Sequence, residues 1–69
     1  MEKTMRIDGM MCNHCKASVE KALSSLEGVN DATVDLEAKT ACIRMEREIP
    51  DQVLMDAVAA KGFIPIEIQ

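Results

Sequence analysis

Two cysteines separated by two residues are the part of this sequence with the clearest capacity for chemistry. Cys12 and Cys15 lie in the segment Gly9-Met10-Met11-Cys12-Asn13-His14-Cys15. Two intervening residues let both sulfur atoms turn toward one point. Thiolate sulfur is a soft ligand that selects soft ions such as Cu(I), and Zn(II) also binds to it. The pair therefore predicts a site for a metal ion.

The coordination number of this site depends on which further ligands the chain can supply. A structural zinc site needs four protein ligands, and only His14 and Cys42 remain as candidates. His14 lies inside the pair, where its ring is badly placed to reach the same ion, and Cys42 is out of phase with the core-facing Ala41 and Ile43. We expect an exposed His14 and a free Cys42 thiol on the open sheet face. The site is then open and two-coordinate, which suits one Cu(I) per monomer.

Redox enzymes also use two cysteines at this spacing. The short chain, the order of its elements and the absence of the aromatic and Pro neighbours usual in such enzymes argue against that reading. We predict no enzymatic activity, with a small dithiol oxidoreductase as the less favoured alternative.

The elements that must position the cysteines follow from the hydrophobic periodicity, which switches between about 2 and about 3.6 residues. It predicts a strand over Lys3–Asp8, a helix over Cys15–Leu26, strands over Val29–Leu36 and Thr40–Met45, a helix opened by Pro50 and Asp51 and ended by Gly62, and a last strand where Ile64, Ile66 and Ile68 alternate. Pro65 places that last strand near a sheet edge or makes its first residues irregular.

This order of elements matches the split βαβ arrangement. We predict an α+β fold, a ferredoxin-like βαββαβ open-faced sandwich in which a four-stranded antiparallel sheet carries both helices on one face. Residues 1–69 are expected to form a single domain. Cys15 falls at the expected helix start, where unpaired N–H groups and the helix dipole favour a thiolate, and Cys12 on the preceding loop shares part of that field.

Composition and charge exclude several classes of partner. The net charge is −4 and charges of both signs are interspersed, whereas nucleic-acid binding needs clustered Lys and Arg. No apolar run approaches the ~20 residues of a membrane span, and the first residues lack the apolar centre of a signal peptide. We therefore predict a soluble cytoplasmic protein with no membrane insertion. In that compartment a close pair of cysteines is more often metal-binding or redox-active than a structural disulfide, and three cysteines cannot all pair within one chain.

Three segments together resemble a known family. The Gly9–Cys15 segment, the Gly28-Val29 step and the Lys61-Gly62-Phe63 step are similar to the heavy-metal-associated domain, over essentially the whole chain. The resemblance implies a ferredoxin-like fold and binding of Cu(I), or in some branches Hg(II), Zn(II) or Cd(II), through the two motif cysteines. Members of the family act as soluble metallochaperones or as N-terminal domains of metal-pumping ATPases.

The resemblance also implies roles for single residues. Cys12 and Cys15 correspond to the ligands, Met10 to the buried Met that anchors the loop, and Phe63 to the position that borders the site. The Asn-His between the cysteines is similar to bacterial copper chaperones. Met11 replaces the usual Thr or Ser, and it stands where relatives that carry Zn(II) tend to have an acid.

The leading hypothesis is a soluble metallochaperone that binds one Cu(I) through the CxxC pair and transfers it to a partner by ligand exchange. The partner would be a copper-transporting P-type ATPase or a copper-responsive regulator. Alternatives are an excised N-terminal domain of such an ATPase, which Phe63 favours, or a mercury- or zinc-binding relative. Hg(II) is expected to bind in vitro. We expect a monomer without metal, and a metal-bridged dimer stays open as an alternative.

Overall fold

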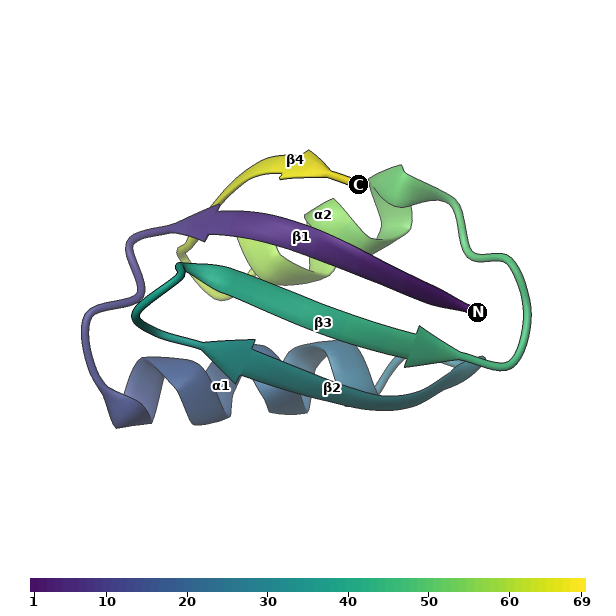
Figure 1. The fold of residues 1–69 in the computed structure, drawn as a ribbon, viewed down its shortest axis with the longest axis horizontal. Coiled ribbons are helices and arrows are strands. Elements are labelled where there is room, and N and C mark those ends of the chain that lie inside the picture. The colour runs from purple at the N-terminus through teal and green to yellow at the C-terminus, as the bar shows by residue number, and fades with distance from the viewer.

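The computed structural model describes all 69 residues and has the predicted order of elements (Figure 1). These are β1 (Glu2–Asp8), α1 (Asn13–Ser24), β2 (Val29–Asp35), β3 (Thr40–Met45), α2 (Asp51–Ala59) and β4 (Ile64–Ile68). The strands form one antiparallel sheet in the order β2-β3-β1-β4. Both helices cover one face of the sheet, so the predicted ferredoxin-like sandwich is confirmed. No helix is long and apolar enough to cross a membrane.

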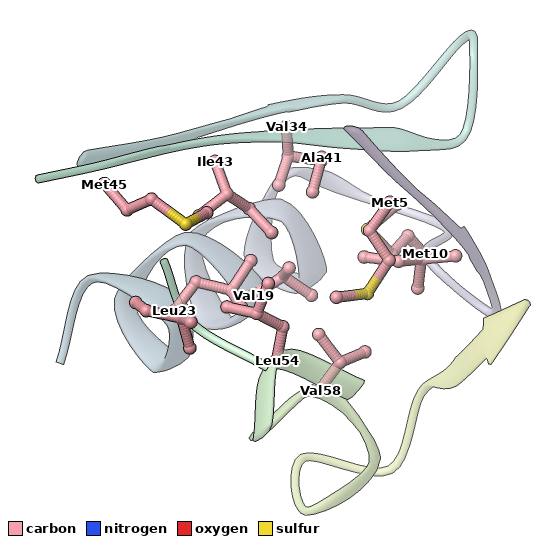
Figure 2. Packing of buried hydrophobic residues seen from close by; sticks show 12 residues of the cluster. Met5, Met10, Val19, Leu23, Val34, Ala41, Ile43, Met45, Leu54 and Val58 are labelled. Atoms are coloured by element: carbon pink, nitrogen blue, oxygen red, sulfur yellow. The ribbon is translucent and has the colours of Figure 1, made fainter. Parts of the chain in front are cut away.

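The core lies between the helices and the covered face of the sheet (Figure 2). Residues that alternate along β1 and β3 meet residues spaced by three or four along α1 and α2, as the two periodicities require. The buried hydrophobic residues are Met5, Ile7, Met10, Val19, Leu23, Val34, Ala41, Ile43, Met45, Ile49, Leu54 and Val58. Burying one such aliphatic or Met side chain contributes about 1.5–3 kcal/mol. This core contains no metal ligand, so the fold closes on apolar contacts alone.

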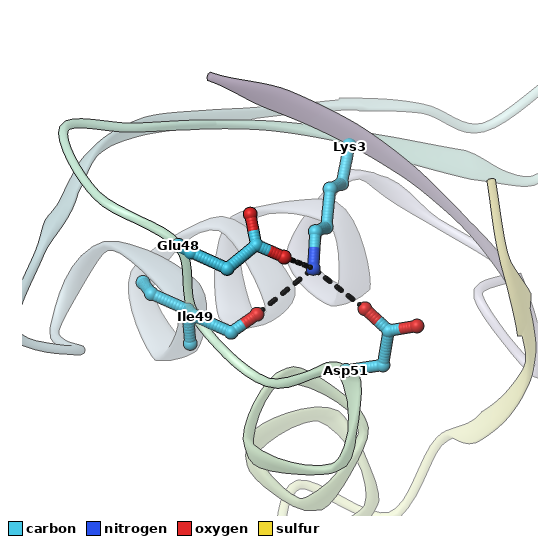
Figure 3. Close-up of polar contacts among 4 residues, drawn as sticks. All are labelled: Lys3, Glu48, Ile49 and Asp51. Atoms are coloured by element: carbon cyan, nitrogen blue, oxygen red, sulfur yellow. Dashed lines mark hydrogen bonds and ion pairs between the residues drawn. The ribbon is translucent and has the colours of Figure 1, made fainter.

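Lys3 fastens the start of β1 to the chain that enters α2 (Figure 3). Its Nζ donates to the carbonyl oxygen of Ile49 at 2.9 Å and to Asp51 Oδ1 at 2.7 Å, and it pairs with Glu48 Oε1 at 2.9 Å. The hydrogen bond to Asp51, followed by that to Glu48, raises the pKa of Lys3 above its ordinary value. These contacts close the end of the sandwich that lies away from the cysteine pair.

The boundaries of α1 differ from the expected Cys15–Leu26. The helix begins at Asn13 and ends at Ser24. Its last turn tightens, with the Leu26 N–H donating to the Leu23 carbonyl oxygen at 3.1 Å, and the chain then passes through Gly28 at φ +95°. The earlier start affects the candidate site, because it makes Cys12 rather than Cys15 the residue at the N-terminus of the helix.

Candidate metal centre

The segment Gly9–Cys12, called the metal loop below, leaves β1 and is fastened to the core at one point. Gly9 turns the chain at φ +93°, and its N–H donates to Asp8 Oδ1 at 3.0 Å. Met10 is only 6% exposed and packs in the core, where Figure 2 shows it near Met5. Phe63 lies beside the turn, since a Cβ on Gly9 would be 3.8 Å from Phe63 Cδ1. The structure thus confirms the buried Met10 and the position of Phe63 along the loop.

The metal loop ends at Cys12, which is the N-cap residue of α1. Cys12 has extended backbone angles, φ −156° and ψ 172°, and its carbonyl oxygen accepts the Lys16 N–H at 3.1 Å. Cys15 follows within the first turn of α1. The two Sγ atoms are 3.6 Å apart. Cys12 is exposed, whereas Cys15 is half-buried and packs against the core.

The helix N-terminus acts on Cys12. The backbone N–H of Cys15, then the Cys15 side chain, then the backbone N–H of His14 lower the pKa of the Cys12 thiol below its ordinary value. The sequence had placed Cys15 at the helix start and given Cys12 only part of the field. That assignment is corrected, because α1 begins two residues earlier and Cys12, not Cys15, is its N-cap residue. The exposed sulfur atom of Cys12 is therefore also favoured as a thiolate.

Among His, Cys, Asp and Glu side chains, the donors at this pair are its two sulfur atoms. No three His, Cys, Asp or Glu side chains come together anywhere in the chain in a way that could hold a metal ion. With metal–sulfur bonds of about 2.3 Å, sulfurs 3.6 Å apart enclose an angle of about 100° at the ion. A linear arrangement would need about 4.6 Å. The two sulfurs can therefore hold an ion whose outer side stays open. The sulfur–metal–sulfur angle approaches linear if the sulfurs separate by about 1 Å.

Of the other candidate residues, two are exposed and the third lies on the open face of the sheet. His14 is exposed, as expected. Met11 is 88% exposed and does not cover the loop. Cys42 lies on the sheet face that carries no helix, with its Sγ 3.6 Å from Glu2 Oε1. Burial, followed by the hydrogen bond to Glu2, raises the pKa of Cys42 above its ordinary value, so this thiol stays protonated at neutral pH.

Glu20 has a contact that its sequence position did not reveal. Its Oε2 accepts the backbone N–H of Val34 at 2.9 Å, which ties the middle of α1 to the edge strand β2. A signal for this contact is absent from the local pattern, because the two residues are distant in sequence. The contact fixes the helix that carries Cys15.

The fold and the exposed dithiol define a class: a small ferredoxin-like domain whose one chemically distinctive feature is a CxxC pair at the start of a helix. Within this class the family is shown by sequence. The heavy-metal-associated domain profile matches residues 4–63. The chain belongs to the heavy-metal-associated domain family.

Three relatives differ in how much of their own length this chain covers. A copper chaperone CopZ from Staphylococcus saprophyticus is 38% identical over 65 residues, covering 88% of this chain and 91% of the relative. A probable copper-exporting P-type ATPase from Archaeoglobus fulgidus is 37% identical over 70 residues, covering 100% of this chain but only 9% of the relative. A mercuric reductase from Acidithiobacillus ferrooxidans is 42% identical over 59 residues, covering 86% of this chain and 11% of the relative. The chain thus spans most of one relative and a small part of the other two.

Solved structures agree with the assignment. A CopZ metallochaperone superposes with a TM-score of 0.91 at 28% identity, covering 96% of this chain and 100% of that chain. A copper binding domain from a P-type ATPase superposes with a TM-score of 0.89 at 30% identity, covering 100% of this chain and 95% of that chain. Free-standing and ATPase-borne domains are therefore equally good structural matches.

Proposed function

We propose that residues 1–69 form a single heavy-metal-associated domain that acts as a copper metallochaperone. It binds one Cu(I) per monomer through Cys12 and Cys15 and passes the ion to a partner protein in the cytoplasm. The observation that carries this proposal is the pair of sulfur atoms 3.6 Å apart, with Cys12 exposed and no third His, Cys, Asp or Glu side chain beside them. The CopZ relative, matched over 91% of its own length, supports copper as the cargo.

Transfer by ligand exchange follows from the openness of the pair. A thiolate of the partner binds the ion from its open side, and one cysteine of this chain is then released. Cys12 is the one expected to leave first, because it is exposed on the metal loop whereas Cys15 is held against the core. A second partner thiolate then replaces Cys15. The ion stays Cu(I) throughout, so no electron donor or acceptor is needed.

Copper is favoured over zinc by the composition of the site. Zn(II) prefers four ligands and accepts carboxylate oxygen, and neither is available beside Cys12 and Cys15. Met11 stands in the position before Cys12 and supplies no carboxylate, which leaves two soft sulfurs that satisfy Cu(I) at low coordination. Hg(II), which also accepts two thiolates, is expected to bind in vitro.

The second candidate is a metal-binding domain of a copper-transporting P-type ATPase. It is favoured by the match of the whole chain to part of the Archaeoglobus fulgidus ATPase and by the ATPase domain structure. Both candidates bind Cu(I) in the same way and differ in what surrounds the domain. As a chaperone, the chain would deliver Cu(I) to such an ATPase or to a copper-responsive regulator. In either case we expect a monomer without metal and no catalysis.

The test is an anaerobic competition between Cu(I) and Zn(II), each buffered by a chelator of known affinity. Cu(I) should bind as one ion per monomer and displace Zn(II). Zn(II) that binds one ion per monomer and resists displacement by Cu(I) would end the copper assignment. A matched assay of disulfide reduction by the metal-free protein should give a rate no higher than that of a free dithiol. A faster rate would favour the oxidoreductase alternative.

A further inference from the structure

The sheet has two outer strands, β2 and β4, and the edge of β4 is protected by its own backbone. Pro65 has no N–H to offer to a further strand. The pairing of β4 with β1 also shifts register between Arg6 and Ile7. A proline and an irregularity of this kind both disfavour the addition of a strand at an edge.

The edge of β2 is protected in another way. β2 pairs with β3 without interruption from Asp31 to Asp35, and Figure 1 shows it as the outermost strand with α1 along it. The Val34 N–H points away from β3, because it donates to Glu20 Oε2 at 2.9 Å. Ala32 lies two residues earlier on the same strand, so its N–H points outward as well. The group that occupies this edge is therefore a side chain of α1, which can move away.

The side chains along β2 differ between the two faces of the sheet. Asp31, Thr33 and Asp35 are exposed on the face without helices. On the helix side, Ala32 and, just beyond the strand, Leu36 are only partly buried, which leaves apolar surface at this edge. A strand added here would place alternate side chains on these two faces. It would meet carboxylates on one face and aliphatic groups on the other.

We propose that the outer edge of β2 is a docking site for an extended segment of a partner protein in which Lys or Arg alternates with apolar residues. The segment pairs with the backbone of Ala32 and Val34 after Glu20 releases the Val34 N–H. Its basic side chains lie opposite Asp31 and Asp35, and its apolar side chains lie beside α1. This site goes beyond the proposed function, because it uses neither cysteine and needs no copper.

A second copy of this chain is a poorer occupant of the same edge. An antiparallel pair of β2 strands centred on Thr33 would pair the whole uninterrupted stretch. It would place Asp31 of each copy opposite Asp35 of the other, and like charges directly opposite destabilise a strand pair. The two released Glu20 carboxylates would add further negative charge. A basic segment is attracted by these same carboxylates, so charge complementarity selects it.

The first test measures the binding of three peptides of equal length to the metal-free protein by calorimetric titration. One peptide alternates Lys and Val, one alternates Glu and Val, and the third is the Lys-Val peptide with a methyl group on every backbone nitrogen. The Lys-Val peptide should bind at least tenfold more tightly than the other two and shift the amide NMR signals from Ala32 to Val34. Equal binding of the methylated peptide would show attraction of charge without strand pairing and would overturn the proposal.

The second test asks whether Glu20 closes the edge. Glu20→Gln and Glu20→Ala remove the same charge, but Gln keeps an oxygen that accepts the Val34 N–H and Ala does not. Glu20→Ala should therefore bind the Lys-Val peptide about fivefold more tightly than Glu20→Gln, and without peptide its Val34 amide should exchange hydrogen faster. Equal affinities would overturn the role of Glu20. Dimerisation of Glu20→Ala without peptide binding would assign the edge to a second copy and overturn the basic partner.

A matched pair of variants separates the edge of β2 from net charge. Asp31 and Glu67 are exposed carboxylates that each pair with an arginine, Asp31 with Arg44 at 3.8 Å and Glu67 with Arg6 at 3.2 Å, but they lie on opposite edges of the sheet. Asp31→Asn should weaken binding of the Lys-Val peptide about threefold at low salt, and Glu67→Gln should leave it unchanged. An equal loss in both variants would overturn the site. Because these assays use metal-free protein, a failure to bind Cu(I) would remove the proposed function and leave the docking site to be judged separately.

Discussion

Replacing Gly9 by Ala should separate the geometry of the metal loop from the stability of the fold. Gly9 has φ +93°, a region that a residue with a Cβ enters at a cost of about 1–2 kcal/mol. There is room for the methyl group, because its nearest neighbours, Phe63 Cδ1 and Cα, would be 3.8 and 4.0 Å away. Strain in the backbone is therefore the whole effect in the folded state.

The net loss of stability is smaller than the strain. Ala restricts the unfolded chain more than Gly and returns about 0.4–1 kcal/mol. We expect Gly9→Ala to lower the free energy of unfolding by about 1 kcal/mol, which for a domain of this size lowers Tm by about 4–8 °C. Thermal unfolding of the metal-free protein, followed by circular dichroism, measures this change.

Gly62→Ala is the matched control. Gly62 has φ +91° and nothing within 4 Å of its added Cβ, so the same strain arises outside the metal loop, in the turn before Phe63. Both variants should lose similar stability. Only Gly9→Ala should weaken Cu(I) binding, by about fivefold, because the metal loop relieves its strain by moving Cys12 relative to Cys15 and binding must reverse that shift.

Two results would refute this reasoning. If Gly9→Ala were as stable as the unaltered protein, the positive φ at Gly9 would be wrong. If it lost stability but bound Cu(I) as tightly as Gly62→Ala does, the turn at Gly9 would have no part in placing Cys12.

Four further outcomes are expected from the structure. Removal of metal by a chelator should leave the far-ultraviolet circular dichroism unchanged, because the core closes without a metal, and loss of helical signal would contradict this. The rate of alkylation by iodoacetamide, measured for each cysteine by mass spectrometry as the pH is varied, should reach half its maximum at a pH below the ordinary cysteine pKa for Cys12 and above it for Cys42. A lowered pKa keeps Cys12 a thiolate to lower pH, whereas a raised pKa keeps Cys42 protonated to higher pH. The same pH profile for both cysteines would count against both shifts. Met11→Asp should increase the affinity for Zn(II) relative to Cu(I) in a chelator competition, because it adds an oxygen ligand beside Cys12, and an unchanged ratio would remove the role given to this position. Leu54→Ala should lower the free energy of unfolding by about 2–5 kcal/mol in denaturant titrations, whereas Val53→Ala, on the exposed side of α2, should change it by less than about 0.5 kcal/mol.

The fold was predictable because each element has a clear period. Ala41, Ile43 and Met45 alternate on β3 and all are buried, as the pattern requires. The alternation at the C-terminus also predicted β4 correctly. It did not predict that Ile64 and Ile66 are 57% and 51% exposed. The pairing of β4 with β1 shifts register at Pro65, the residue that predicted an edge position or an irregular start, but which side chains the shift exposes depends on the partner strand.

The candidate site was predictable as a pair of residues and less so as a local structure. The spacing of Cys12 and Cys15 was enough to bring two sulfurs together. The start of α1 was placed too late, because the apolar period begins after the metal loop whereas the backbone turns helical at Asn13, before any core-facing residue. The contacts of Glu20 with Val34 and of Lys3 with Asp51 join distant parts of the chain and follow only from the tertiary fold.

Anaerobic titration with Cu(I), followed by native mass spectrometry, tests the central claim most directly. The unaltered protein and Cys42→Ser should each gain one copper ion and hold it against a competing chelator. Cys12→Ser and Cys15→Ser should each lose that tight binding, since one thiolate leaves the ion without its second soft ligand. Loss of copper in Cys42→Ser together with its retention in Cys15→Ser would contradict the assignment of the site.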